Sequence, residues 1–290
     1  MQRFVLTLLS VLTPGGLIMA SSLNKDDLTK TQYSGPIHCL ELPFERLNFG
    51  SIGHTNWKQW IPDTQYSVGA DSLAVEFMDD GKRALRVQLN PTDEGSNHVQ
   101  AGSKIAPNQT YRLKQSVYLE TGWDWGGKNK GGKLGFGLGG GSTPTGGLIK
   151  NDGFTVRFSW RGNRDGSARI TAYSYAADRT LNLPFGDELI LDGFNPPINK
   201  WFDLMMGVRT NSSSDVSDGT LKAWANDQLL LEKYNIRWQS AGSKPLIDKL
   251  LFTTFYGGNG PTWAPERTTY VRFSDVCWSM VADNEIEQEG

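Results

Sequence analysis

Short runs of alternating apolar and polar residues recur along most of the chain. Strict alternation places successive side chains on opposite faces of an extended segment, and it predicts β-strands with one buried face. Turn-forming sequences rich in Asp, Asn and Gly separate the runs, for example Asp79-Asp80-Gly81 and Asn151-Asp152-Gly153. The strands predicted in this way cover residues 38–43, 73–78, 84–90, 97–105, 111–120, 133–139, 154–161, 168–176, 201–209, 220–226, 228–233, 248–256 and 269–278.

The order of these segments predicts an all-β fold. About a dozen short strands without helical segments between them favour antiparallel sheets over a βαβ arrangement. For a chain of 290 residues, the expected form is an antiparallel β-sandwich of the jelly-roll type. Neither a linker nor an internal repeat divides the sequence, and we therefore expect one domain over residues 37–280.

Both ends of the chain depart from this pattern. Residues 1–20 combine Arg3 with an apolar run too short to span a bilayer and with the small residue Ala20, as is typical of a secretory signal peptide. Residues 21–36 are polar without periodicity and predict a flexible N-terminal segment, and residues 281–290 predict an acidic tail. We therefore expect a secreted, extracellular protein.

Charge and cysteine content narrow the possible partners. The chain has 29 Lys and Arg residues against 31 Asp and Glu residues, a net charge of −2, so no general basic field attracts nucleic acid or membrane. We expect a monomer. Two cysteines, Cys39 and Cys277, lie near the two ends of the predicted domain. In an oxidising compartment they can form one disulfide, although two separate buried thiols are the alternative.

The segment 131–141 is unusual because it is a predicted strand rich in glycine. Its alternation places Leu134, Phe136 and Leu138 on one face. The other face carries Lys133 followed by glycines, namely Gly135, Gly137 and Gly139. Glycines persist inside a strand mainly where something approaches the backbone closely. The segment therefore predicts an amine beside a bare floor on which an extended anionic ligand can lie.

Two further strands carry unusual polar faces. Residues 162–166 form a turn that makes 154–161 and 168–176 a hairpin, so their polar faces lie side by side. These faces comprise Thr155, Arg157, Ser159 and Arg161 on one strand and Arg169, Thr171, Tyr173 and Tyr175 on the other. Solvated outer faces are the ordinary explanation for such residues. Tyrosine pairs and glycines gain little there, however, so the three strands together favour a ligand-binding surface.

Two segments elsewhere can contribute to the same surface. His98 and Gln100 share one face of the strand predicted over 97–105. Trp263 follows a predicted strand in a loop rich in Gly and Pro. A loop tryptophan can stack on a sugar ring, or it can simply pack the loop.

Lysine, arginine and paired tyrosines together can cut a polymer of uronic acids by β-elimination. A cation neutralises the C6 carboxylate, a base removes the C5 proton, and an acid protonates the departing O4. This chemistry requires no cofactor. The three histidines, His38, His54 and His98, stand in unrelated settings and argue against a zinc site, while a structural calcium ion with oxygen ligands stays open.

Hydrolytic chemistry has less support in the sequence. Glycanases of the sandwich type often carry Glu-x-Asp-x-x-Glu on one strand, and that spacing is absent. The acidic run from Asp187 to Asp192 stands among loop-like residues. A Gly-x-Ser-x-Gly nucleophile motif and a phosphate-binding loop are absent as well.

Taken together, these blocks resemble polysaccharide lyase family 14 and, more loosely, the glucuronan lyases. The resemblance covers roughly residues 80–278 and rests on four motifs. They are the Gly-Gly-Lys-Leu strand with its later Gly-Gly pair; Phe154, Arg157, Trp160 and Arg161; the Tyr173-x-Tyr175 pair; and the block 252–258 with Trp263-Ala264-Pro265. The resemblance implies a jelly roll with a substrate cleft on its concave sheet, and cleavage of alginate or a similar polyuronate.

The resemblance also implies roles for individual residues. Catalytic positions fall on Lys133, Arg157, Tyr173 and Tyr175, with base and acid not assigned among the lysine and the tyrosines. We expect substrate contacts from His98, Gln100, Thr155, Arg161 and Trp263. Thr155 stands where the family has serine, and Gly135 where it often has proline, so the polymer is left open. The alternatives are a non-catalytic carbohydrate-binding module or lectin and, with less support, a glycoside hydrolase on the same fold.

Overall fold

The computed structural model describes residues 35–127, 130–147, 149–179, 184–258 and 260–282. The chain divides into residues 1–31 and a second unit, 32–290, and all described residues belong to the second. The predicted signal peptide and acidic tail, and nearly all of the predicted flexible segment, therefore lie outside the described residues, apart from 35–36 and 281–282.

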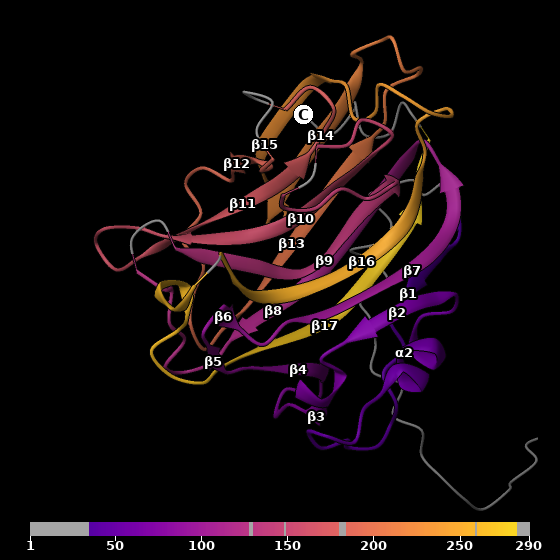
Figure 1. Ribbon diagram of the computed structural model, residues 1–290. Helices are drawn as coiled ribbons and strands as arrows, with labels where there is room; N and C mark the ends of the chain where they lie inside the picture. Colours follow the sequence, from indigo (N-terminus) through magenta and orange to yellow (C-terminus); the bar gives the residue numbers. More distant parts are fainter. Residues whose placement is uncertain (1–34, 128–129, 148, 180–183, 259, 283–290) are drawn as a thin grey trace, which may run out of the picture. The chain divides into compact units, whose positions relative to one another are not determined.

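Within the described residues, the second unit consists of two large antiparallel sheets that face each other (Figure 1). The eight-stranded sheet has the order β15 (Gln228–Ile236), β14 (Gly219–Ala225), β13 (Trp201–Arg209), β8 (Thr110–Leu119), β17 (Thr269–Met280), β4 (Arg83–Leu89) and β3 (Leu73–Phe77), with β1 (Ile37–Cys39) paired to β17. The seven-stranded sheet has the order β12 (Asp187–Ile190), β11 (Ala168–Tyr175), β10 (Gly153–Gly162), β9 (Gly131–Gly141), β16 (Ile247–Gly257), β7 (Val99–Asn108) and β2 (Thr64–Val68).

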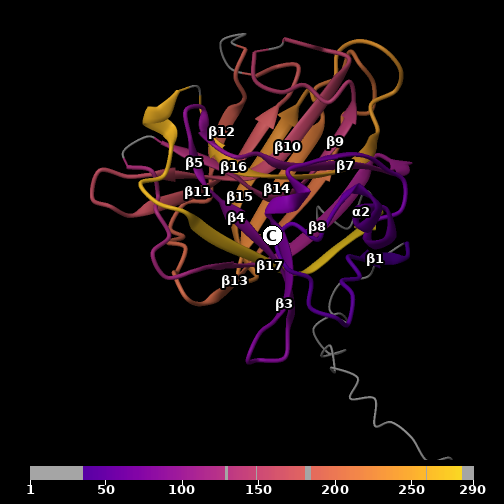
Figure 2. The same ribbon diagram turned by 60° about the horizontal axis from the view of Figure 1, so that its bottom comes forward.

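Smaller elements complete the sandwich. A two-stranded sheet pairs β5 (Pro91–Thr92) with β6 (Gly95–Ser96). Helix α2 (His54–Trp60) packs beside β2 at the edge of the seven-stranded sheet (Figure 1), and Figure 2 shows the same helix from another direction. Two short 3-10 helices, η1 (Ala70–Ser72) and η3 (Pro261–Trp263), lie in loops. The predicted all-β jelly roll is confirmed.

Every strand predicted from the alternation overlaps an observed strand, but some short elements were missed. The prediction that the run from Asp187 to Asp192 is loop-like was wrong, because its first four residues form β12 at the edge of the seven-stranded sheet. Both carboxylates of β12 remain partly exposed, so the strand has no apolar alternation to reveal it. Strand β2 was not predicted for the same reason, because it has only one buried residue.

The core between the sheets determines which side chains face outward on the seven-stranded sheet. Phe136 of β9 packs on Phe252 of β16, with ring centroids 4.8 Å apart, and Phe252 packs on Phe273 of the opposite sheet at 5.4 Å. Since side chains alternate along a strand, burying this apolar set turns the neighbouring polar set to the outer face of the sheet. The alternation read from 154–161 is confirmed, because Phe154, Val156, Phe158 and Trp160 are all buried in the core.

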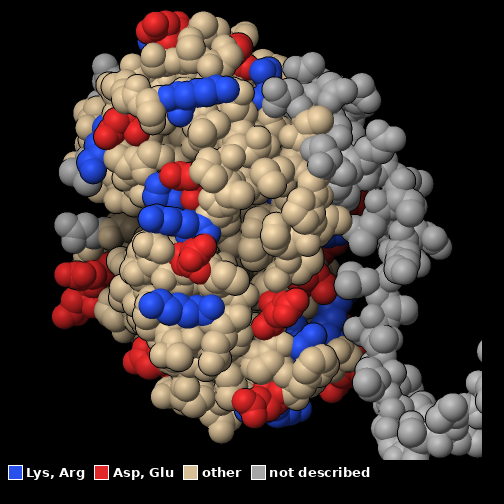
Figure 3. Space-filling view, turned by 90° about the vertical axis from the view of Figure 1, so that its right-hand side faces the viewer, with Lys and Arg blue, Asp and Glu red and all other residues tan. Residues whose placement is uncertain are grey.

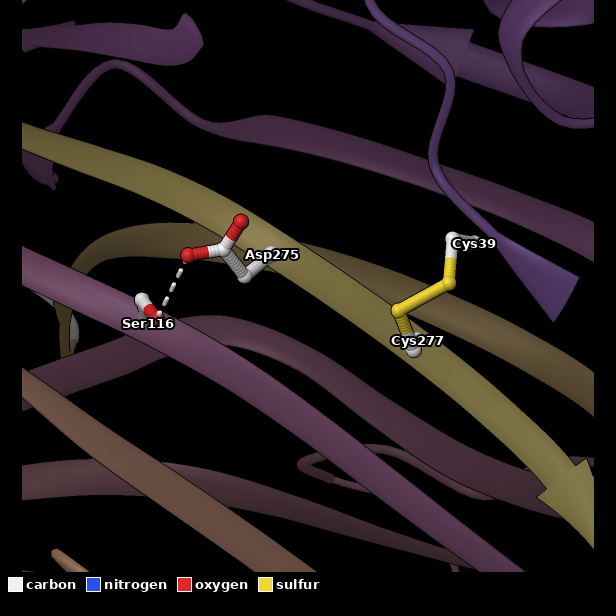
Figure 4. The surroundings of a disulfide bond; sticks show 4 residues. All are labelled: Cys39, Ser116, Asp275 and Cys277. Atoms are coloured by element: carbon white, nitrogen blue, oxygen red, sulfur yellow. Dashed lines mark hydrogen bonds between the residues drawn. A yellow bond between two sulfur atoms is a disulfide. The ribbon is translucent and has the colours of Figure 1, made fainter. Parts of the chain in front are cut away.

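The predicted disulfide is present. Cys39 and Cys277 are directly opposite each other in the pairing of β1 with β17, and their sulfur atoms are bonded (Figure 4). The bond lies on the eight-stranded sheet near the side chains of Ser116 and Asp275, which share a hydrogen bond of 3.4 Å. It ties the first described strand to the last one across 238 residues of sequence.

Replacing both cysteines by alanine is expected to lower stability without changing the intrinsic activity of the folded protein. The chain-entropy model gives an upper figure of about 5 kcal/mol for a loop this long. The bond belongs to the eight-stranded sheet, whereas the cavity described below lies on the other sheet. Denaturant unfolding of the variant should show the loss, and the turnover of the folded fraction should match the wild type. A fall in turnover at full folding would contradict this separation.

The surface is consistent with the balanced composition. On the face shown in Figure 3, Lys and Arg residues are interspersed with Asp and Glu residues over a mostly uncharged surface. Among the described residues, no helix is long and apolar enough to cross a membrane.

Candidate active site

A cavity of about 600 Å³ lies on the outer face of the seven-stranded sheet. All but one of the predicted site residues line it: His98, Gln100, Lys133, Arg157, Arg161, Tyr173, Tyr175 and Trp263. They come from β9, β10, β11, the start of β7 and the loop after β16. The fold therefore assembles the residues that were singled out on separate strands of the sequence.

Strand pairing explains why these side chains meet. Strands β9, β10 and β11 are neighbours, and β10 pairs with β11 so that Arg157 stands opposite Tyr173 and Thr155 opposite Tyr175. On the other side of β10, Ser159 stands opposite Lys133. Directly opposed residues in an antiparallel pair carry their side chains on the same face. The predicted hairpin with adjacent polar faces is confirmed.

Lys133 packs directly on a tyrosine. Its Nζ lies 3.1 Å from the centroid of the Tyr173 ring. Burial lowers the pKa of Lys133 well below its usual value, and the positive charges of Arg157 and Arg161 lower it further, whereas Glu188 opposes the shift. A lowered pKa enlarges the neutral fraction of the amine, which is the form in which Lys133 can accept a proton.

Arg157 is a buried cation with unused hydrogen-bonding capacity. The residue is 6% exposed, and its Nη2 donates to Thr155 Oγ1 at 3.0 Å. Its Nε has no hydrogen-bond partner among the described residues. Burial lowers the pKa of Arg157, yet a guanidinium remains protonated in proteins. A carboxylate entering the cavity would supply the missing acceptor and neutralise the charge.

Thr155 does not line the cavity, in contrast to the predicted substrate contact. The residue is fully buried, and its hydroxyl donates to the carbonyl oxygen of Pro144 at 3.0 Å while accepting the bond from Arg157. Its hydroxyl is thus committed to the protein. Thr155 supports Arg157 from beneath instead of reaching a ligand.

The two tyrosines form a packed pair beside these cations. Their ring centroids are 5.4 Å apart, and the phenol oxygen of Tyr173 accepts a hydrogen bond from the backbone N–H of Gly186 at 3.1 Å. Burial and the neighbouring Tyr173 raise the pKa of Tyr175, although Arg157 opposes the shift. Tyr175 therefore holds its proton at neutral pH and is suited to donating it.

His98 and Gln100 form one wall of the cavity. Gln100 Nε2 and His98 Nδ1 are 3.4 Å apart, and the imidazole stacks on Phe255 with centroids 4.1 Å apart. Burial lowers the pKa of His98, although Glu94 opposes the shift. At neutral pH the imidazole is therefore uncharged, and it offers hydrogen bonds instead of a positive charge.

Arg161 and Trp263 form a second wall. The Arg161 guanidinium lies 5.5 Å from the centroid of the Trp263 ring and makes an ion pair with Glu188. A Cβ atom at Gly258 would collide with the Trp263 ring, so this tryptophan packs on its own loop as well as lining the cavity. The loop-packing interpretation of Trp263 is therefore confirmed, and stacking on a sugar ring stays a prediction.

The prediction that the glycines of β9 leave open space for a ligand was wrong. A Cβ atom at Gly137 would lie 2.5 Å from Cγ of Arg157, and one at Gly139 would lie 3.1 Å from Cγ2 of Thr143. At Gly135 it would point between the sheets, 2.3 Å from Oε1 of Gln115. Protein side chains therefore occupy the space above these glycines. Because these glycines have no side chains, Arg157 and the residues of the core can pack against β9. The space is not open to a sugar chain.

Several residues that line or adjoin the cavity were not predicted as site residues, among them Phe185, Phe255 and Glu188. Phe185 and Phe255 line the cavity, and Phe185 is 58% exposed. Glu188 of β12 stands opposite Tyr173 and pairs with Arg161. The acidic run containing Glu188 was visible in the sequence, but its position depends on the pairing of β12 with β11, for which no pattern gave a signal. Among the described residues, no group of three or more His, Cys, Asp or Glu side chains could hold a metal ion.

Comparison with known families identifies the class of protein. The family model for polysaccharide lyase 14 matches residues 72–276. The chain belongs to polysaccharide lyase family 14 and is a polysaccharide lyase, which decides against the lectin and hydrolase alternatives. A search of curated proteins gave no match.

Solved structures agree on the fold. A variant of alginate lyase Aly36B in complex with alginate tetrasaccharide superposes with a TM-score of 0.71 at 19% identity, covering 86% of this chain and 98% of that one. The alginate lyase from Aplysia kurodai gives 0.64 at 21% identity, covering 83% and 100%. The endo-β-1,4-glucuronan lyase from Trichoderma reesei gives 0.50 at 10% identity, covering 83% and 96%.

Proposed function

We propose that this lyase cleaves 4-linked uronic acid polymers, either alginate and polymannuronate or glucuronan, by β-elimination and leaves unsaturated uronate ends. The observation that carries the proposal is the position of Lys133, whose amine lies against Tyr173 beside the buried Arg157 and has a lowered pKa. A proton acceptor, a carboxylate-binding cation and a protonated phenol are the three groups that this elimination needs.

Each residue in the proposed mechanism has one task. Arg157 binds the C6 carboxylate at the cleavage site and withdraws charge, which makes the C5 proton more acidic. The neutral Lys133 amine removes that proton. The electron pair left on C5 then forms the C4–C5 double bond as the C4–O4 bond breaks, and a tyrosine phenol protonates O4. Tyr175 carries its proton at neutral pH and lies beside Arg157, and it is therefore our candidate for the donor.

The remaining cavity residues position the polymer. The uncharged His98 and Gln100 donate or accept hydrogen bonds at the carboxylate end of the sugar. Arg161 and Trp263 offer a cation and an aromatic surface to a neighbouring sugar. We also propose that the enzyme is a secreted monomer that works without a cofactor. The signal-like residues 1–20 and the disulfide support secretion.

Two observations from relatives support the substrate class. The Aly36B variant seen with alginate tetrasaccharide has one lysine and one tyrosine replaced by alanine. The Aplysia kurodai and Trichoderma reesei structures are an alginate lyase and a glucuronan lyase. Polymannuronate, polyguluronate and polyglucuronate are therefore the panel that tests this proposal. The polymer that yields ultraviolet-absorbing unsaturated ends fastest is the substrate, and absence of such ends with all three would refute the proposal.

Glu188→Gln is expected to move the pH profile of kcat/KM toward acid. The Glu188 carboxylate stabilises the Lys133 ammonium, so removing its charge lowers the pKa of the amine further. A base works in its neutral form, and the acidic limb of the profile should therefore move to lower pH. Asp192→Asn, on the exposed side of the same segment, serves as the control and should leave the limb in place. A limb that stays fixed or moves toward alkaline pH in Glu188→Gln would contradict the assignment of Lys133 as base.

A further inference from the structure

Strand β9 is out of regular register with β10 just where Lys133 stands. Arg157 is opposite Gly137, but Ser159 is opposite Lys133, so β9 advances four residues while β10 advances two. Strand β9 stays in regular register with β16 on its other side. The irregularity is therefore a bulge of residues 134–136 on the β10 side, and bulges commonly redirect a side chain near an active site.

The bulge determines where Lys133 lies along the sheet. Continuing the regular pairing from Arg157 and Gly137 would place Lys133 opposite Arg161. The observed pairing places it opposite Ser159 instead, two residues nearer to Arg157. Two residues of strand correspond to about 7 Å. The bulge thus moves Lys133 from the row of Arg161 to the row of Ser159 and Thr171, which is next to the row that holds Arg157 and Tyr173.

A glutamine from the opposite sheet satisfies the backbone of the bulge. Gln115 of β8 donates from Nε2 to the carbonyl oxygen of Leu134 at 3.1 Å, and its Oε1 accepts from the N–H of Phe136 at 2.8 Å. The N–H of the residue between them, Gly135, donates to Thr254 Oγ1 at 3.1 Å. Side chains of β8 and β16 thus satisfy three backbone groups of the bulge.

The apolar surroundings of Gln115 indicate that its hydrogen bonds to the bulge are what make its burial tolerable. It is fully buried on the inner face of β8, where the flanking inward residues are Leu113 and Val117. A polar amide in such a place is costly unless it is hydrogen-bonded. Gly135 has φ +80, and a Cβ atom there would lie 2.3 Å from Gln115 Oε1. The side chain of Gln115 can therefore approach the bulge this closely only because residue 135 is glycine.

We propose that Gln115, assisted by Thr254, is a positioning residue for the reaction: it holds the β9 bulge from the core side and thereby keeps the Lys133 amine beside Arg157 and Tyr173. Neither residue lines the cavity. The inference rests on the proposed role of Lys133 in proton transfer. Losing the support should displace the amine, and a displaced base lowers the rate of the chemical step more than it weakens substrate binding.

The test compares Gln115→Leu and Thr254→Val with Val117→Ala, which alters the same inner face of β8 without touching the bulge. Gln115→Leu removes both bonds to the bulge, and Thr254→Val removes the acceptor for Gly135. We expect kcat to fall at least about ten-fold in Gln115→Leu and by a smaller factor in Thr254→Val, with KM within about two-fold of wild type. Val117→Ala should keep its kcat at a comparable loss of thermal stability.

The outcomes separate this inference from the proposed function. If the wild type forms no unsaturated ends on any polyuronate, the proposed function fails first. If the wild type is active, the inference is overturned when both variants keep kcat within about two-fold of wild type, or when Val117→Ala loses as much kcat at the same stability. Should Gln115→Leu fail to fold, the kcat of Thr254→Val relative to Val117→Ala decides the question alone.

Discussion

Lys133→Met is expected to reduce kcat by about a thousand-fold while leaving oligosaccharide binding nearly unchanged. Positioned general bases contribute about 10²- to 10⁴-fold, and we expect a loss near the middle of this range because no other amine packs against the tyrosine pair among the described residues. A thousand-fold loss corresponds to about 4 kcal/mol of transition-state stabilisation. Methionine keeps the length and the apolar stem of the side chain, so the cavity should keep its shape.

The measurement pairs steady-state kinetics with calorimetric binding of an oligouronate. Lys104→Met is the matched control, because Lys104 is exposed on β7 and lies away from the cavity lining. Wild-type turnover in the control with strongly reduced turnover in Lys133→Met supports the assignment. If Lys133→Met instead loses affinity and keeps kcat, the lysine is a binding residue and not the base.

Arg157→Met should lower kcat/KM by about 10²- to 10³-fold, the range observed when a preorganised charge-stabilising donor is removed. The guanidinium faces a C6 carboxylate whose charge must be neutralised before the C5 proton can leave. The variant also removes a buried group whose Nε has no partner among the described residues. The loss of transition-state stabilisation calculated from kcat/KM should therefore exceed any loss in the free energy of unfolding.

A methyl-esterified substrate tests whether Arg157 acts by neutralising the carboxylate. A methyl-esterified polyuronate carries no carboxylate charge, so the difference between wild type and Arg157→Met should shrink on that polymer. Arg164→Met, in the exposed turn of the same hairpin, is the control and should behave as wild type. An equal loss on the charged and the esterified polymer would mean that Arg157 positions the sugar without neutralising it.

The sequence was sufficient for the fold and for most of the site, because both depend on alternation. Period-two patterns placed Arg157 and Arg161 on one face of β10 and the tyrosines on one face of β11, and the short turn between the strands made the pairing predictable. The disulfide followed from there being two cysteines, Cys39 and Cys277, in a chain with a signal-like start.

What the sequence could not reveal depends on contacts between distant segments. Thr155 has the same alternation as Arg157, but the loop carrying Pro144 covers it and engages its hydroxyl. The glycines of β9 look like open space until the Arg157 side chain is placed across Gly137. Gln115 resembles an ordinary polar residue on a strand, and its role appears only when β8 faces the bulge across the core.

Stability and activity are expected to separate in this fold. The eight-stranded sheet carries the disulfide, whereas the seven-stranded sheet carries the cavity. Gln115 connects the two, because it belongs to β8 but bonds to β9. Substitutions on the core side of β8 therefore need kinetic as well as thermal measurements before a role is assigned.

The most direct test of the account is the ratio of unsaturated ends to new reducing ends during cleavage of a polyuronate by the wild-type enzyme. Elimination forms one C4–C5 double bond for every chain cut, so the account predicts equal numbers of the two ends throughout the reaction. Lys133→Met should slow the appearance of both ends together. New reducing ends without matching unsaturation would mean hydrolysis and would contradict the central claim.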